Sequence, residues 1–322
     1  MTVDLTRFIF NSNNLDEGFT QSEISTLSNC GMKWNLGYNI GLRLKGGFSW
    51  ALAVGSSVHD CIEQMLVSRS PNFVLQPFQY PPGTLLTPAE QDKEYYWRCV
   101  VQAMMEAFAI YYKDDWNREY DVKDIEMELD IKWQGLRLRG KIDWKMMYAD
   151  LSKYIVDWKT CSRLDKGMTE EWDFRFQFMF YPWAAKQMGM DINGFMPCAI
   201  KKPELRVKIG ESVETFAARV RFDMITDPDK YFYRELLPLT DGAMKHFEDV
   251  VLAPKVARLQ ILADPNPSLQ NIQRAIALDM NTDHCQRYGA PCEFIRLCRH
   301  GWDDYGFEYE TKHQKHTELT EE

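Results

Sequence analysis

Hydrophobic and polar residues alternate most regularly between Gly140 and Thr160. A period of two over two such runs predicts β-strands, and the short segment 149–151 between them predicts the turn of a hairpin. A three-residue turn places Asp143 opposite Asp157, on the same face of the hairpin. The apolar face consists of three residues from each strand: Ile142, Trp144, Met146, Tyr154, Val156 and Trp158.

The polar face of this hairpin carries both carboxylates and several lysines. Two carboxylates that face each other across a ladder repel, so their pairing needs a cation. Lys159 points to the same face as Asp157, two residues away. The arrangement has two interpretations, a site for a hard divalent metal or the solvated face of an ordinary hairpin.

The remaining hydrophobic pattern predicts helices mixed with strands. Two further strands are predicted over 125–133 and Gly194–Lys201, and a strand pair over 207–222. Strands and helices mixed along one chain indicate an α/β or α+β fold with a small mixed sheet. The predicted helices and irregular segments, in chain order, are an irregular start over 1–18, a helix over 20–34 with Ser22 as its N-cap, a turn at 49–57 leading into a helix with His59 in its first turn, a proline-rich loop over 71–88, helices over 89–116, 169–188, 236–262 and 268–280, and a polar, fraying tail over 303–322.

Composition narrows the class of protein. The 38 basic and 47 acidic residues give a net charge of −9, which argues against a protein that coats nucleic acid without specificity. An enzyme with a local basic groove remains compatible with this balance. No apolar run approaches the roughly 18 residues that span a bilayer, and the N-terminus does not resemble a signal peptide, so we expect a cytoplasmic protein that does not bind membranes.

The chain contains eight cysteines, and their spacing is uneven. Four are scattered and are best interpreted as buried small side chains: Cys61, Cys99, Cys161 and Cys198. Cys285, Cys292 and Cys298 lie close together near the C-terminus, and Cys30 near the N-terminus can complete a quartet. Zinc sites use closer cysteine pairs, so these gaps favour an iron–sulfur cluster over zinc, although zinc stays open.

Several motifs now follow one another in a recognisable order. They are a helical His59, Gly140-Lys-Ile-Asp143, Val156-Asp157-Trp-Lys159, and Gln177 followed four residues later by Tyr181, with one cysteine before them and three after. Taken together they resemble the PD-(D/E)xK nuclease superfamily, in its RecB-like branch with an iron–sulfur cluster, which includes Cas4-like and AddB-type exonucleases. Two features depart from that pattern: Asp157 stands where many relatives have glutamate, and the cysteine gaps are wider than usual.

The resemblance implies an α/β fold, with a restriction-endonuclease-like core of a small mixed β-sheet flanked by helices and an iron–sulfur-stapled helical region. It implies a single nuclease domain over 1–322, divided at about 70, 120, 235 and 302. His59, Asp143, Asp157 and the Trp158 carbonyl are then the expected ligands of Mg²⁺ or Mn²⁺. Cys30, Cys285, Cys292 and Cys298 are the expected ligands of a [4Fe-4S] cluster.

The catalytic residues implied by the resemblance are Asp143, Asp157, Lys159, Gln177 and Tyr181. Lys159 would position the attacking water or neutralise charge, Gln177 would orient Lys159 or the phosphate, and Tyr181 would contact the DNA strand. Further candidates complete the expected site: Glu63 and Glu126 near the metal, which Glu126 or Glu128 could join, and Arg163 and Arg175 for phosphate contacts. Trp50 and Trp158 could stack on bases, although burial in the core explains them more simply.

The resemblance implies a metal-dependent deoxyribonuclease, an exonuclease acting on single strands or DNA ends in recombination, repair or phage DNA metabolism. Two alternatives stay open: a DNA-binding adaptor that has lost cleavage, and a Cas4-like partner that trims DNA for an integration complex. DNA is the expected partner, and other protein partners or a homo-oligomer remain open.

Overall fold

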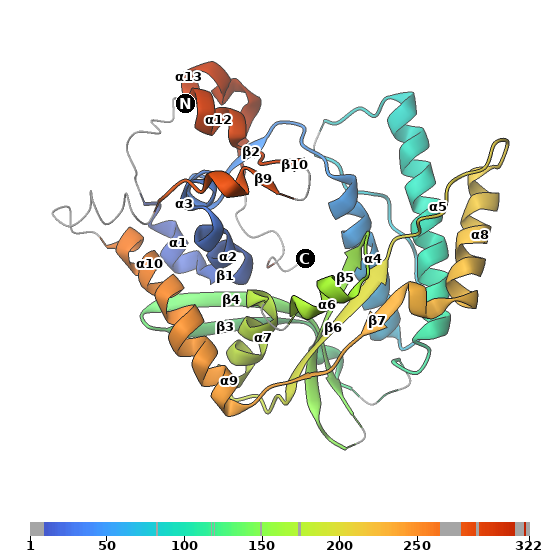
Figure 1. Cartoon of the computed structure of the whole chain (residues 1–322), viewed down its shortest axis with the longest axis horizontal. Coiled ribbons are helices and arrows are strands. Elements are labelled where there is room, and N and C mark those ends of the chain that lie inside the picture. The colour runs from blue at the N-terminus through green and yellow to red at the C-terminus, as the bar shows by residue number, and fades with distance from the viewer. Residues whose placement is uncertain are drawn as a thin grey trace.

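A mixed β-sheet lies between two groups of helices in the computed structural model, which describes residues 10–81, 83–116, 118, 120–148, 150–172, 175–264, 278–287, 290–312 and 319 (Figure 1). This arrangement confirms the predicted α/β class with helices flanking a mixed sheet. The seven strands of the sheet are β1 (Phe19–Thr20), β3 (Ile125–Trp133), β4 (Leu136–Met147), β5 (Lys153–Cys161), β6 (Gly194–Lys201), β7 (Phe232–Arg234) and β8 (Leu237–Pro238).

The long strand β4 organises this sheet. One edge of β4 pairs with β3 along nearly its whole length. The other edge is shared, because β1 pairs in parallel at Leu138 and Arg139 and β5 pairs antiparallel from Trp144 onward. The residues of β4 between these two partners, 140–143, therefore face a gap in the ladder on that edge.

The predicted hairpin is β4 and β5, and its register is confirmed. Trp144 pairs with Val156 and Met147 with Lys153, and Tyr148 closes the turn through hydrogen bonds with Ser152 and Leu151. The same register, continued by one residue, sets Asp143 opposite Asp157. β5 then pairs in parallel with β6, so β5 is an interior strand. Of the two interpretations of the polar face, the solvated one does not fit β5, since Ile155 on that face is fully buried and Asp157 is 2% exposed.

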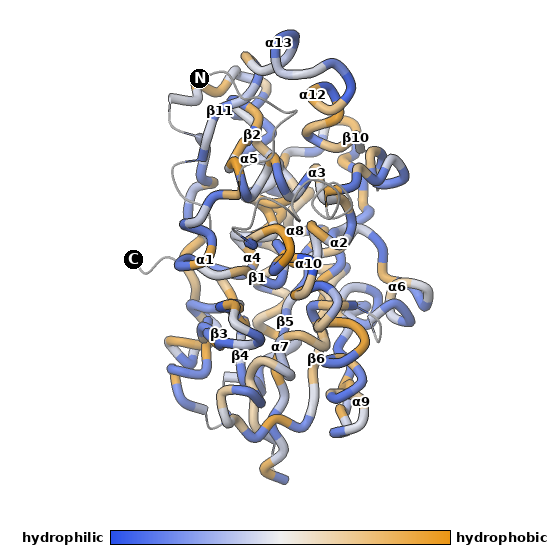
Figure 2. The backbone as a smooth tube through the Cα atoms, turned by 90° about the vertical axis from the view of Figure 1, so that its left-hand side faces the viewer, coloured by the Kyte–Doolittle hydropathy of each residue, from blue (hydrophilic) through white to orange (hydrophobic). Residues whose placement is uncertain are grey.

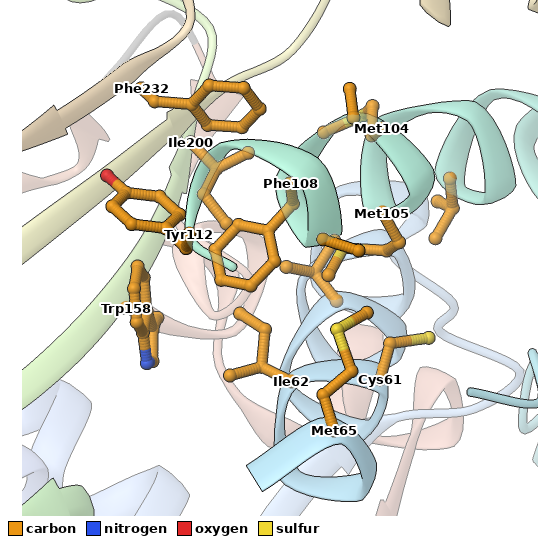
Figure 3. Packing of buried hydrophobic residues seen from close by; sticks show 14 of the residues in the cluster. Cys61, Ile62, Met65, Met104, Met105, Phe108, Tyr112, Trp158, Ile200 and Phe232 are labelled. Carbon is orange, nitrogen blue, oxygen red and sulfur yellow. The ribbon is translucent and has the colours of Figure 1, made fainter. Parts of the chain in front are cut away.

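Three helices cover one face of the sheet: α4 (Trp50–Ser68), α5 (Pro88–Tyr111) and α8 (Val213–Thr226). Their apolar side chains form one buried cluster with Trp144, Val156 and Trp158 of the hairpin. Figure 3 shows Phe108 of α5 and Ile62 of α4 in this cluster, with Trp158 beside them. Burial of Trp158 and Val156 fixes which face of β5 turns away from these helices, and hence where Asp157 points.

The other face is covered mainly by α2 (Gln21–Asn29), α7 (Phe176–Gln187), α9 (Asp241–His246) and α10 (Ala253–Ala263). A π-helical segment over Phe247–Leu252 joins α9 and α10 into one continuous helical path. Ile155, Phe178 and Phe195 are buried in this second cluster. In the sequence, α7 lies between the parallel strands β5 and β6. The three elements therefore form a βαβ unit.

A third, smaller cluster joins the two ends of the chain. Strand β2 (Leu42–Leu44) pairs antiparallel with β11 (Tyr309–Thr311), and Leu36, Phe294 and Leu297 pack beside them. Figure 2 shows this region at one end of the molecule, with β3, β4 and β5 toward the other. The remaining short α-helices and strands of the described residues are α1 (Asn13–Glu17), α3 (Gly31–Trp34), α6 (Lys166–Glu170), β9 (Gln286–Arg287), β10 (Ala290–Pro291), α12 (Ile295–His300) and α13 (Trp302–Tyr305).

Several predicted helices have different bounds. The N-cap of α2 is Thr20 rather than Ser22, and Cys30 adopts an extended backbone that separates α2 from α3. α4 begins at Trp50 with Ser49 as its N-cap, so His59 lies in its third turn rather than its first. α7 starts only at Phe176, and the helix α5 ends at Tyr111.

Three other predictions were wrong or lie outside the described residues. The region 207–222 does not form a strand pair, because α8 occupies Val213–Thr226. The ends of the chain are more ordered than expected, since α1 falls within 1–18 and β11 within the polar tail. Most of the predicted helix over 268–280 lies outside the described residues. The division into parts at about 70, 120, 235 and 302 stays a prediction.

In the part of the chain that the structure describes, none of the helices combines the length and the apolar character needed to cross a bilayer.

Candidate active site

Asp143 lies where the β4–β5 ladder ends. Its Oδ2 atom accepts a hydrogen bond from the backbone N–H of Trp158 at 2.6 Å. The carboxylate thus bridges the two strands, next to the gap on the edge of β4. The Asp143 side chain keeps 15% exposure, so one side of the carboxylate remains open.

His59 reaches the same point from α4. Gly55, one turn earlier, lies so close to β5 that an added Cβ would stand 3.4 Å from the Thr160 Oγ1 atom. This close approach brings the His59 Nδ1 atom to 3.5 Å from the Asp143 Oδ2 atom. The imidazole and the carboxylate therefore meet although they come from different layers of the fold.

Asp157, Lys159, Gln177 and Tyr181 form a chain of contacts beside them. The Asp157 Oδ1 atom accepts hydrogen bonds from Lys159 Nζ at 3.0 Å and from Gln177 Nε2 at 2.9 Å. Gln177 Nε2 also lies 3.3 Å from the Tyr181 hydroxyl, as expected for residues one turn apart on α7. Asp157 is only 2% exposed, whereas Lys159 is 31% exposed.

The absence of a side chain at Gly140 makes room for the ring of Tyr181. An added Cβ at Gly140 would lie 2.8 Å from the Tyr181 Cε1 atom and 3.6 Å from Phe180 Cε1. A glycine inside a strand often marks such a close approach. The glycine of the Gly140-Lys-Ile-Asp143 motif is therefore explained by the packing of the Tyr181 ring on β4.

The four charged groups shift one another's pKa values. Burial raises the pKa of Asp157 to about 6, and the nearby Asp143 adds to this effect. Burial acts to raise the pKa of Asp143 as well, but the cations of His59 and Lys159 hold it below its ordinary value. Burial acts to lower the pKa of His59, yet Asp143 raises it to about 9. Burial likewise opposes the charged form of Lys159, but Asp157 and Asp143 raise its pKa.

Three side chains, two of which belong to this cluster or contact it, are suited to bind a divalent cation. His59, Glu126 and Asp143 each offer a ligand atom, and these three atoms all lie within 4.8 Å of one another. One imidazole and two carboxylates are ligands that Mn²⁺ and Mg²⁺ accept. The residues present therefore fit a divalent metal. Glu126, predicted near the metal and able to join it, belongs to this group, whereas Asp157 lies outside it.

The other predicted site residues are two tryptophans and two arginines. The Trp158 side chain is 1% exposed and packs on Phe108, so of its two interpretations the structure confirms core burial and not base stacking. Arg175 is near enough for its charge to act on the pKa of Lys159, whereas Arg163 pairs with Asp165 at 2.5 Å. Trp50 is partly buried, with Lys93 Nζ 5.1 Å from its ring centre.

The four cysteines of the predicted quartet lie near one another. Burial raises the pKa of Cys298 to about 12, and the charges of Cys292, Cys30 and Cys285 add to this effect. Cys30 caps α3 by accepting a hydrogen bond from the N–H of Lys33, and the N–H of Cys292 donates to the carbonyl of Cys285 at 2.8 Å. Cys30, from the N-terminal part of the chain, is therefore close enough to Cys298 for its charge to affect the pKa of that thiol.

A buried ion pair next to Trp158 of β5 was not predicted from the sequence. Arg234 binds Asp115 through both guanidinium Nη atoms, and Asp115 is 4% exposed. The guanidinium also lies 5.0 Å from the ring centre of Trp158 and donates to Cys198 Sγ at 3.3 Å. No local motif marks this pair, because its members are 119 residues apart in the chain.

The sequence profile of the PD-(D/E)XK nuclease superfamily matches residues 18–299, and the chain belongs to this superfamily. No curated protein matches the sequence. Among solved structures, a protein from Eubacterium rectale named as a candidate exonuclease is similar over 93% of both chains, at 13% identity and a TM-score of 0.42.

Proposed function

We propose that the protein is a metal-dependent deoxyribonuclease, acting as an exonuclease on single-stranded DNA or DNA ends. The observation that carries this proposal is the contact between Lys159 and Asp157 beside the Asp143–His59 pair. On the solvated face of an ordinary hairpin, an aspartate would not be buried with a partly exposed lysine in contact with it. Such burial of charge is typical of functional sites.

The ligands of the proposed metal are His59, Asp143, Asp157 and the Trp158 carbonyl. A divalent ion held there lowers the pKa of a bound water and stabilises negative charge on a phosphoryl group. The Trp158 N–H fixes the Asp143 carboxylate by a 2.6 Å hydrogen bond, so this ligand is oriented before any metal binds. His59 must lose its proton to act as a ligand, since only the neutral ring offers a lone pair.

Lys159 is proposed as the residue that acts on the substrate. Its ammonium is held by both oxygens of Asp157, at 3.0 and 2.8 Å, and stays charged because the two aspartates raise its pKa. A fixed positive charge at this position can orient a water or neutralise the charge that develops on the phosphate. Its partial exposure leaves it accessible to a substrate strand.

Gln177 and Tyr181 are proposed to position the cluster from α7. Gln177 donates to Asp157 rather than to Lys159, so it would act on the lysine through the carboxylate. The Tyr181 hydroxyl lies next to the Gln177 amide, and its ring is fixed against Gly140. Arg175, at the N-terminus of α7, is the nearest candidate for a phosphate contact.

We further propose that Cys30, Cys285, Cys292 and Cys298 hold a [4Fe-4S] cluster, as in the RecB-like branch. Four thiols whose charges influence one another, beside the apolar side chains of Leu36, Phe294 and Leu297, are suitable for such a cluster. The cluster would join the N-terminal helices to the C-terminal segment.

Substitution of the two central residues tests the nuclease proposal. Asp157→Ala and Lys159→Ala should abolish Mn²⁺- or Mg²⁺-dependent degradation of a labelled single-stranded oligonucleotide. Asp130→Ala and Lys132→Ala are matched controls, since both residues are exposed on the neighbouring strand β3. These controls should retain full activity. Full activity in both the Asp157 and the Lys159 variants would exclude the proposed site.

A further inference from the structure

Glu126 has an unusual backbone for a strand residue. Its φ angle is +48°, in the left-handed region that residues other than glycine seldom adopt. In the β3–β4 ladder Ile125 pairs with Trp144 and Met127 pairs with Ile142. Glu126 and Asp143 lie opposite each other between these two pairs, but they are not themselves paired in the ladder. A local interruption of this kind redirects a side chain, and such interruptions are common beside active sites.

The redirected carboxylate points to the metal-binding group. Its Oε2 atom lies 2.9 Å from Lys141 Nζ, and the carboxylate belongs to the group formed with His59 and Asp143. Glu126 is 22% exposed, which keeps it open to solvent. The side chain is therefore both accessible and close to two groups already expected to bind metal.

An ordinary ion pair with Lys141 does not account for this geometry. The direct cross-strand partner of Lys141 is Glu128, whose backbone is regular. Glu128 instead contacts Arg139 at 3.0 Å, and Lys141 contacts Glu126. A lysine that only required a carboxylate could use the one opposite it, without a left-handed residue in the strand.

Asp157 is less available on this side of the cluster. Its Oδ1 atom already accepts two hydrogen bonds, its Oδ2 atom lies 2.8 Å from Lys159 Nζ, and the residue is 2% exposed. Asp157 is outside the set of three whose ligand atoms lie within 4.8 Å. The second carboxylate that accompanies Asp143 on the open side is that of Glu126.

We propose that Glu126 is a further ligand of the divalent metal, and that Lys141 occupies its carboxylate until the metal displaces the ammonium. This inference rests on the proposed function, because it concerns the same metal site. Binding then exchanges one Glu126–Lys141 ion pair for one Glu126–metal contact, and Lys141 becomes free to meet a phosphate. The removal of Glu126 should weaken metal binding, and the removal of the Lys141 charge should strengthen it.

Metal affinity of the full-length protein, freed of divalent ions, tests this proposal without a cleavage assay. Mn²⁺ is titrated into the wild type, Glu126→Gln, Lys141→Met and Asp143→Asn, and free Mn²⁺ is followed by electron paramagnetic resonance. Glu126→Gln should raise the Kd about tenfold or more, in line with the loss of a metal-site group. Lys141→Met should lower the Kd at least threefold. Glu128→Gln, which removes the same charge two residues away, is the matched control and should change the Kd less than twofold.

The outcomes separate this proposal from the function on which it rests. Wild-type affinity in either Glu126→Gln or Lys141→Met, with a large loss in Asp143→Asn, overturns the role of Glu126 and leaves the nuclease site standing. Unchanged affinity in Asp143→Asn overturns the metal site itself. Thermal unfolding of each variant accompanies the titrations. Lys141→Met leaves the ligand set intact, so the proposal stays testable even if the Glu126 variant does not fold.

Discussion

The contact between Gly140 and Tyr181 leads to a specific prediction for Gly140→Ala. The backbone of Gly140 is not in the left-handed region, so an alanine meets no conformational penalty there. Alanine in place of glycine should even favour the folded state by about 0.4–1 kcal/mol, since it restricts the unfolded chain. Any loss must therefore come from the added methyl group.

That methyl group would lie 2.8 Å from the Tyr181 Cε1 atom and 3.3 Å from Cδ1. Overpacking of this kind costs about 1–3 kcal/mol, so the net destabilisation should be about 0–2.5 kcal/mol. Tyr181 must move by roughly half an ångström, and Gln177 moves with it because the two side chains are in contact. A displacement of 1 Å at a catalytic group can cost about 100-fold in rate, so nuclease activity should fall about tenfold.

Initial rates on a single-stranded oligonucleotide and denaturant unfolding curves measure the two effects. Gly242→Ala, in α9, is the matched control, because its added Cβ would have 3.8 Å to the nearest atom. In the Tyr181→Ala background this clash is absent, so adding Gly140→Ala there should no longer destabilise the protein. Wild-type activity and stability in Gly140→Ala would refute the proposed packing role of this glycine.

Three further results are expected. Because Asp143 raises the pKa of His59 to about 9, metal binding should release a proton, and affinity should rise about tenfold per pH unit between roughly pH 6 and 8; calorimetry in buffers of different ionisation heat measures this release. With the proposed [4Fe-4S] cluster, the purified protein should be brown and contain iron, and Cys298→Ser should remove both. Arg234→Met should cost about 3 kcal/mol in denaturant unfolding, since Asp115 then loses its bidentate partner.

Each of these results has a matched comparison. Metal affinity that is independent of pH would contradict the protonated state of His59. Zinc without iron in protein purified under anaerobic conditions would exclude the cluster, and Cys99→Ser should keep both colour and iron. Lys245→Met removes an exposed ion pair with Asp249 and should cost below about 1 kcal/mol, in contrast to Arg234. Equal losses in the two variants would contradict the buried role of Arg234.

Local pattern was sufficient for the central strands and insufficient for some helices. Alternation predicted β3 and the register of the hairpin, and a short apolar run predicted β6, which is buried on both faces. The run through Val220, Arg221 and Phe222 also alternates, which favoured a strand. In the structure Phe222 is 71% exposed, and the buried residues are Phe216, Val220 and Met224 at helical spacing. Which residues are buried was decided by packing against α5, which the local pattern does not contain.

The site could be predicted only where its residues lie on regular elements. The facing positions of Asp143 and Asp157 follow from a period of two and a short turn. The proximity of His59 depends on the approach of α4 to β5 at Gly55, which is a tertiary feature. The orientation of Glu126 depends on a left-handed backbone conformation. The sequence does not predict this conformation, because glutamate rarely adopts it.

The most direct test of the nuclease proposal is digestion of 5′- and 3′-labelled oligonucleotides, single- and double-stranded, with Mn²⁺, with Mg²⁺ and with a chelator. We expect the wild-type protein to shorten single strands or duplex ends progressively from one terminus. This digestion should require the divalent ion and should be lost in Asp157→Ala. Absence of cleavage by the wild type with either ion, or unchanged cleavage in the presence of chelator, would contradict it.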